Sequence, residues 1–168
     1  MDKVKVSDKL LLSVEKPARY TGGELNSIVK EAARLRFALC FPDVYEIGMS
    51  HLGSRILYEV INSREEYACE RCFAPWPDME KAMRENNVPM FTLETRTPLA
   101  ECDIVGFSLL YEMCYTNILT MLDLAHIHKR SADRGENEPI IVAGGGCACN
   151  PEPIADFMDA IMIGDGED

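Results

Sequence analysis

The fold is decided by Arg36-Phe37-Ala38-Leu39-Cys40-Phe41 and, after Pro42, by Asp43-Val44-Tyr45-Glu46-Ile47-Gly48. The first half is an apolar run of strand length, and a helical pattern begins directly after the second half. The segment Asp43 to Gly48 therefore occupies the turn between a first strand and a first helix. In doubly wound α/β domains this turn lies at the edge of the sheet where ligands bind.

Short apolar runs and helical patterns alternate through the rest of the chain. Further strands are predicted at 67–73, 103–109, 139–143 and 160–163, and helices at 52–61, from Pro77, at 115–128 and near 154–158. Strands separated by helices of this length form βαβ units and a parallel sheet. We therefore predict a flavodoxin-like (Rossmann-type) doubly wound α/β fold with five parallel strands in the order 2-1-3-4-5.

The chain divides into residues 1–34, an N-terminal arm and helix, and residues 35–168, the α/β domain. The helix is predicted because five apolar residues recur on one helical face: Leu25, Ile28, Val29, Ala32 and Ala33. The sequence stops just past the last predicted strand, before any fifth helix. We therefore expect a fragment of a longer polypeptide, in which the N-terminal helix covers part of one face of the sheet.

Composition restricts the class of protein. With 168 residues and 47% apolar content the chain suits a single core. Lys and Arg number 17 against 28 Asp and Glu, and the resulting net charge of -11 disfavours nucleic acid and anionic membranes as partners. No apolar run approaches the roughly 20 residues of a membrane helix, and the N-terminus lacks a signal peptide. With seven cysteines, an odd number, we expect a soluble cytoplasmic protein with reduced thiols.

Four segments are predicted to meet at the carboxyl ends of the strands: 42–48, 108–111, 144–150 and 164–168. The third begins with three consecutive glycines, which leave the backbone bare and allow positive φ angles at low steric cost. These four segments form the candidate ligand site.

Three pieces of this edge resemble the motifs of cobalamin-binding domains. The loop D-x-Y-x-x-G is similar to their D-x-H-x-x-G loop, and Ser108-Leu109-Leu110 and Gly144-Gly145-Gly146 are similar to their S-x-L and G-G motifs. The resemblance implies that the loop holding Asp43, Tyr45 and Gly48 lies under the corrin ring. It also implies that Ser108, within the motif that ends at Leu110, hydrogen-bonds the base of the nucleotide tail. The glycines, with Gly164 after the last strand, would line the tail's channel.

Tyr45 stands where that family has its cobalt-ligating histidine. A neutral phenol is a poor cobalt ligand, so the resemblance implies a base-off cobalamin without a histidine from the protein. His51 lies six positions downstream, at a predicted helix start rather than at the motif position.

A more specific similarity connects the chain to the N-terminal part of cobalamin-domain radical S-adenosylmethionine proteins. It is carried by Lys16 to Tyr20, Phe41 to Gly53 and Gly164 to Glu167. In that family a barrel follows, with a [4Fe-4S] cluster on C-x-x-x-C-x-x-C, a motif this sequence lacks. The resemblance therefore implies an accessory domain without catalytic residues of its own. Its partner would be a downstream barrel in the same polypeptide that holds the cluster and S-adenosylmethionine. Cobalamin would then carry a methyl group or tune radical chemistry through cobalt redox.

Two other functions remain open: a cofactor-free docking domain of the same fold, and a flavodoxin-like domain that binds a flavin or a nucleotide. A receiver domain is disfavoured because Ser108-Leu109-Leu110 stands where a phosphorylatable aspartate is needed. No metal site is expected. Cys69-x-x-Cys72 and Cys147-x-Cys149 supply four thiols, but the predicted topology places the two pairs on opposite sides of the first strand. The role of these pairs is left open.

Overall fold

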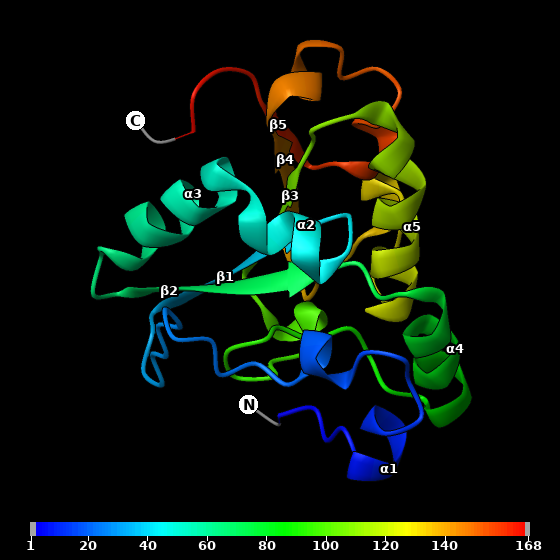
Figure 1. Cartoon of the computed structure of the whole chain (residues 1–168). Coiled ribbons are helices and arrows are strands. Elements are labelled where there is room, and N and C mark those ends of the chain that lie inside the picture. Colours follow the sequence, from blue (N-terminus) through cyan, green and yellow to red (C-terminus); the bar gives the residue numbers. More distant parts are fainter. Residues whose placement is uncertain (1–2, 167–168) are drawn as a thin grey trace.

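The structure is a computed structural model that describes residues 3–166. Its centre is an all-parallel sheet of five strands in the order β2-β1-β3-β4-β5, which confirms the predicted fold (Figure 1). The strands are β1 (Leu35–Phe41), β2 (Tyr67–Phe73), β3 (Ile104–Ser108), β4 (Ile140–Gly144) and β5 (Ala160–Met162). All five lie within about two residues of the predicted runs. β1 and β3 in particular read as nearly continuous apolar stretches, as expected of strands buried on both faces.

Helices cover the two faces of the sheet unequally (Figure 1). On one side lies α3 (Leu52–Asn62), and on the other lie α4 (Pro77–Asn86) and α5 (Tyr115–Leu124). Two short helices, α1 (Asp8–Leu11) and α2 (Tyr45–Ser50), precede β1 and follow it. The remaining helical pieces are 3-10 turns: η1 (Pro17–Tyr20), η2 (Leu99–Glu101), η3 (Glu112–Cys114), η4 (Ser131–Asp133), η5 (Gly146–Cys149) and η6 (Ala155–Phe157).

Two of the predicted helices are shorter than expected. The helix predicted at 115–128 ends at Leu124, since His126 adopts a left-handed φ of 58° that stops the α-helix. The helix predicted near 154–158 is the single 3-10 turn η6.

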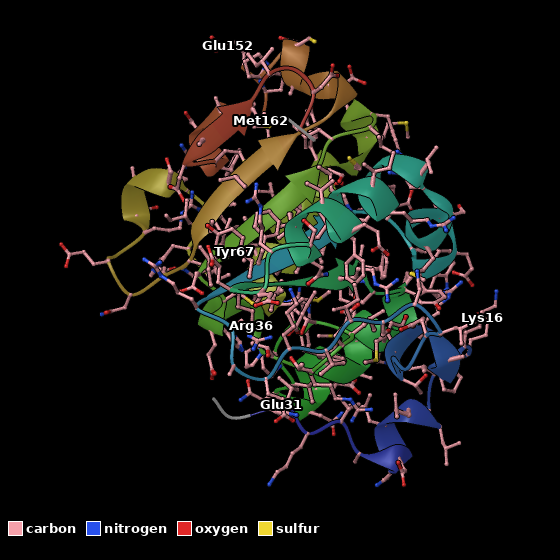
Figure 2. The ribbon with its side chains drawn as sticks, turned by 90° about the vertical axis from the view of Figure 1, so that its left-hand side faces the viewer. Lys16, Glu31, Arg36, Tyr67, Glu152 and Met162 are labelled. Atoms are coloured by element: carbon pink, nitrogen blue, oxygen red, sulfur yellow. The ribbon has the colours of Figure 1, made fainter. Side chains whose placement is uncertain are left out.

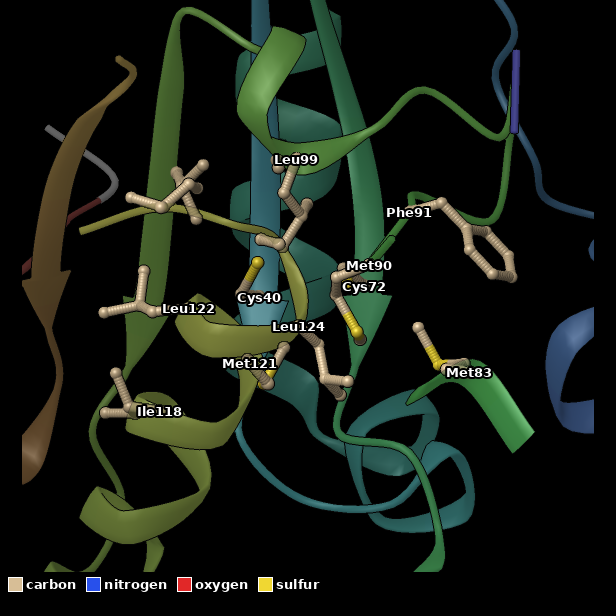
Figure 3. Close-up of a cluster of buried hydrophobic side chains, with 14 of the residues drawn as sticks. Cys40, Cys72, Met83, Met90, Phe91, Leu99, Ile118, Met121, Leu122 and Leu124 are labelled. Atoms are coloured by element: carbon tan, nitrogen blue, oxygen red, sulfur yellow. The ribbon is translucent and has the colours of Figure 1, made fainter. Parts of the chain in front are cut away.

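The larger core lies between the sheet and the α4/α5 layer (Figure 3). There Cys40 and Cys72 from the sheet pack in one cluster with Ile118, Met121 and Leu122 of α5. The N-terminal arm joins this core through six buried apolar residues: Val4, Val6, Leu10, Leu11, Val14 and Tyr20. The arm is therefore an integral part of the folded domain.

The prediction of a helix over Leu25 to Ala33 is wrong. The segment follows Gly22 and Gly23, which have φ angles of 67° and 83°, and it forms turns and irregular backbone instead. Nine residues are too few to hold a helix without tertiary support. Here the tertiary contacts favour another conformation, because Lys30 Nζ donates to the carbonyls of Asn62, Arg64 and Tyr67 at 2.7 Å each.

A buried ion pair connects β1 with β2. Arg36 Nη1 pairs with a carboxylate oxygen of Glu70, whose side chain is only 1% exposed. The same carboxylate accepts hydrogen bonds from the hydroxyls of Thr92 and Thr95. Because a buried charge is costly unless it is paired and hydrogen-bonded, this network fixes the position of the 92–97 segment beside the sheet. Arg36 is labelled in Figure 2.

One half of the α3 side of the sheet is left open. Ser108, Gly144 and Met162 are register partners across β3, β4 and β5. Val142 and Ala160 lie two positions before Gly144 and Met162, so their side chains point to the same face of the sheet. We call the surface formed by these five residues the open sheet face. In Figure 2, which views this side, α3 lies over the β1/β2 half and leaves β4 and β5 uncovered. Met162 is accordingly 56% exposed.

No helix in residues 3–166 is both long enough and apolar enough to span a membrane.

Candidate functional site

The residues predicted for the site all lie at or just beyond the carboxyl ends of β1, β3, β4 and β5. They are Asp43, Tyr45 and Gly48 after β1, Ser108 and Leu110 at the end of β3, Gly144, Gly145 and Gly146 at the end of β4, and Gly164 after β5. Residues 167 and 168, the end of the fourth predicted segment, lie outside the described residues. The structure divides these residues between two environments, one at β1 and β2 and one at β3, β4 and β5.

Asp43 connects the loop after β1 with the loop after β3. Its Oδ1 accepts a hydrogen bond from Val44 N at 2.7 Å, and its Oδ2 accepts one from the hydroxyl of Tyr111. The same loop is held from α5, where Asn117 Nδ2 donates to Pro42 O at 2.9 Å. Tyr111 is 40% exposed. It ends the predicted segment 108–111 but was not itself predicted as a site residue, since nothing in its spacing marks it as a partner of Asp43. The hydrogen bond to Asp43 raises the pKa of Tyr111 to about 12.

We expect the substitution Asp43→Asn to lower the pKa of Tyr111 towards its ordinary value of about 10. The reason is that the phenolate no longer faces a carboxylate. In the wild type the hydrogen-bonded phenol is retained below pH 10 and is lost as the pH rises through about 12. The measurement is a tyrosine NMR titration with Tyr111 assigned from Tyr111→Phe. Asp133→Asn, at an exposed and distant carboxylate, is the control and should leave the titration of Tyr111 unchanged.

Tyr45 points away from the β3 and β4 loops. Its ring packs edge-on against Phe73 of β2 with centroids 5.5 Å apart, and its hydroxyl donates to Glu24 Oε1 at 3.2 Å. Burial, and secondarily the charge of Glu24, raise the pKa of Tyr45. Tyr45 thus holds the N-terminal arm against β2.

Gly48 has a packing role at the same place. A Cβ atom there would lie 2.2 Å from Phe73 Cε1 and 3.1 Å from Phe41 Cδ1. A glycine is therefore required for α2 to approach these two rings, independently of any ligand.

Ser108 and Gly144 lie on the open sheet face. Ser108 is only 9% exposed, and its hydroxyl makes no hydrogen bond to a residue in the range 3–166. A Cβ atom on Gly144 would make only ordinary contacts, 3.6 Å from Met162. Gly146 and Gly164 have no atom within 4 Å of the place where a Cβ would be. Ser108 and these glycines thus leave bare backbone with a free hydroxyl beside it.

Gly145 is different from its two neighbours. Its φ is 115°, and a Cβ atom there would lie 2.8 Å from the carbonyl oxygen of Leu109. Leu109 N donates to Gly144 O at 2.7 Å, and Cys147 N donates to Leu109 O at 3.0 Å. A glycine is therefore needed at position 145 for the backbone after β4 to pack against Leu109 at the end of β3, independently of any ligand.

We expect Gly145→Ala to lower the free energy of unfolding by about 1–3 kcal/mol, because the methyl group meets Leu109 and the backbone is left-handed. Gly146→Ala, one position on, has open space around it and should change stability by about 0.5 kcal/mol or less. Urea unfolding of both variants measures the difference. Equal stability of the two variants would contradict the packing role assigned to Gly145.

Several exposed apolar side chains lie along this edge. Leu110 and Met113 follow β3, Met162 ends β5 and Ile163 follows it, and all four side chains are exposed. Exposed apolar side chains that gather at one edge are typical of a ligand or protein contact surface.

Cysteines supply no metal centre in the described part of the chain, where no group of three or more His, Cys, Asp or Glu side chains could hold an ion. Cys69 is buried in the cluster that includes Tyr58 of α3, and Cys72 is buried in the larger core on the other face. Cys147 is half-buried and Cys149 is exposed beside the glycines.

Two small cavities lie near β2, away from the open sheet face. One is lined by residues that include Met49, Tyr58 and Arg71, and the other by residues that include Tyr20 and Tyr45. Each holds about 20 Å³, the space of about one water molecule. Neither can receive an organic cofactor.

The strand order and the bare backbone at the carboxyl edge define a flavodoxin-like α/β domain, a class that binds ligands at this edge. Residues 53–168 match the family described as radical SAM proteins, N-terminal. The chain belongs to this family, as the N-terminal domain of a radical S-adenosylmethionine protein that has other domains. The match begins at residue 53, so the Asp43 to Gly48 loop precedes it. A comparison with curated proteins finds no match.

Proposed function

We propose that this domain binds cobalamin in the base-off form, without a histidine ligand from the protein, at the carboxyl edge of its sheet. The observation that carries the proposal is the open sheet face, where the unpartnered hydroxyl of Ser108 lies in register with the bare Gly144. A flat heterocyclic base placed over Gly144 would meet bare backbone, flanked by the hydroxyl of Ser108 on one side and the side chain of Met162 on the other. Gly146 and Gly164 extend the bare surface beyond the strand ends.

The donor groups near the Asp43 loop fit this form of the cofactor. The hydroxyl of Tyr45 donates a hydrogen bond to Glu24, and a neutral phenol is a weak ligand for cobalt. His51, the histidine nearest to the loop in sequence, is the N-cap of α3, and its Nδ1 accepts a hydrogen bond from Ser54 N at 3.1 Å. Its ring also packs against Phe41. Since Nδ1 is the acceptor, a neutral His51 carries its proton on Nε2, so the ring offers no free lone pair to a metal. This arrangement favours a cobalamin without an imidazole ligand.

In this proposal the domain serves a downstream barrel of the same polypeptide that holds a [4Fe-4S] cluster and S-adenosylmethionine. A bound cobalamin would supply a cobalt centre able to carry a methyl group or change oxidation state. Ser108 would hold the base of the tail, and Gly144, Gly145 and Gly146 would let the tail approach the backbone. The apolar side chain of Leu110 would exclude water from the ring.

The test is retention of the cofactor. The protein is incubated with hydroxocobalamin, reduced, freed of excess by gel filtration and analysed by absorption spectroscopy. We expect about one corrinoid per chain with a base-off spectrum. A colourless protein that remains folded by circular dichroism would contradict the proposal, and flavin retained instead would support a flavodoxin-like function.

A second candidate, a cofactor-free docking domain, is favoured by the engagement of Asp43 and Tyr45. Both motif side chains already have partners within the chain, Tyr111 and Glu24. This function predicts that a folded, colourless domain binds the separately produced remainder of its parent polypeptide.

A further inference from the structure

The proposed function does not say which side chain faces the lower side of the corrin ring. Tyr45 does not fill it, because its ring and hydroxyl are held by Phe73 and Glu24 on the β2 side. A different aromatic residue stands at the carboxyl edge of the sheet, between β1 and β3. Tyr111, on the loop after β3, is partly exposed and reaches the carboxylate of Asp43 on the loop after β1.

The Asp43–Tyr111 pair connects the loop after β1 with the loop after β3. These two strands lie at the point where the strand order of the sheet reverses. In the order β2-β1-β3-β4-β5 the chain moves outwards from β1 in one direction to β2 and in the other through β3. Ligands of doubly wound sheets bind in the crevice at this switch point. The pair therefore occupies the centre of the edge, and Leu110 and Met113 expose apolar side chains on the same loop.

Resting on the proposed function, we infer that Tyr111, held in place by Asp43, is the side chain beneath the cobalt and that it faces the metal without coordinating it. In metal sites a carboxylate commonly orients the group that faces the metal through a hydrogen bond. Here the phenol donates to the carboxylate, so it faces the metal as a neutral group. The phenol is protonated at neutral pH in any case, and the hydrogen bond to Asp43 raises its pKa further, which makes ionisation less favourable still. Its ring would then exclude water from the lower side.

A pair of histidine substitutions in the full chain tests this assignment. The variants Tyr111→His and Tyr45→His are loaded with cobalamin, reduced to Co(II) and studied by electron paramagnetic resonance. An imidazole at position 111 would lie beside Asp43, in the carboxylate–histidine arrangement of many metal sites. We expect nitrogen superhyperfine splitting from Tyr111→His and an unchanged base-off spectrum from Tyr45→His. Tyr111→Phe should also keep the base-off spectrum.

The assignment is overturned by the reverse pattern, or by a Tyr111→His variant that retains cobalamin with an unchanged spectrum. If Tyr111→His does not fold, Tyr111→Ala provides the second measurement. It should admit water to the lower side, seen as coupling to ¹⁷O-labelled water that wild type and Tyr45→Ala lack, and absence of this coupling also overturns the assignment. Failure of the wild type to retain any corrinoid would instead refute the proposed function, and the assignment with it.

Discussion

Gly144→Trp is expected to abolish cobalamin retention while the domain stays folded. Gly144 lies between Ser108 and Met162 in the register of the sheet, and its Cβ position has only ordinary contacts, so the substitution introduces no backbone clash. The indole would lie on the open sheet face, where we place the tail of the cofactor. We expect affinity to fall by roughly 100-fold or more, which corresponds to about 3 kcal/mol. Gel filtration after incubation with hydroxocobalamin measures the loss.

The matched control is Gly135→Trp. Gly135 is exposed, has nothing within 4 Å of its Cβ position, and precedes the amino end of β4, opposite to the candidate site. This variant should retain cobalamin like the wild type. A tryptophan at Gly145 would be a poor test, because it would unfold the β3–β4 junction as well as fill the site. Equal retention by Gly144→Trp and Gly135→Trp would place the tail elsewhere.

Arg36→Met is expected to lower the free energy of unfolding by about 3–5 kcal/mol. The substitution keeps most of the apolar volume of Arg36 but leaves the carboxylate of Glu70 buried without its cation. The hydroxyls of Thr92 and Thr95 then remain as its side-chain hydrogen-bond donors. Urea unfolding at neutral pH, followed by circular dichroism, measures the change.

The double variant Arg36→Met with Glu70→Leu separates the charge effect from lost packing. Replacement of a whole buried pair by apolar residues is often nearly neutral, so the double variant should recover most of the loss. The surface pair Lys81–Glu85 is the control, and Glu85→Ala should change stability by about 0.5 kcal/mol or less. A double variant as unstable as Arg36→Met alone would show that packing, rather than the unpaired charge, causes the loss.

The architecture was predictable because its signals are local. The apolar runs of β1 and β3, the turn at Asp43 and the proline that opens α4 each identify an element without knowledge of its neighbours. The error at Leu25 to Ala33 has the opposite origin. Its apolar spacing suits a helix, but Leu25 is fully exposed, and the segment's conformation is set by contacts such as those of Lys30 with the end of α3 and the start of β2.

The details of the candidate site were less predictable, because they depend on contacts between loops. Tyr111 becomes a candidate through its hydrogen bond to a residue 68 positions earlier. Gly145 is indistinguishable in sequence from Gly144 and Gly146, and only the approach of Leu109 shows that it is needed for packing. Similarly, the motif places Tyr45 at the edge, but Glu24 and Phe73 decide where its side chain points.

The burial of the N-terminal arm has a consequence for synthesis of the protein in the cell. The arm leaves the ribosome before the segments that bind it: Glu15 N donates to Asp78 Oδ2, and Val4 N donates to Arg96 O. Its apolar side chains must therefore wait, exposed, until β2, α4 and the segment beyond them have emerged. Nascent chains at this stage are the ones we expect chaperones to hold.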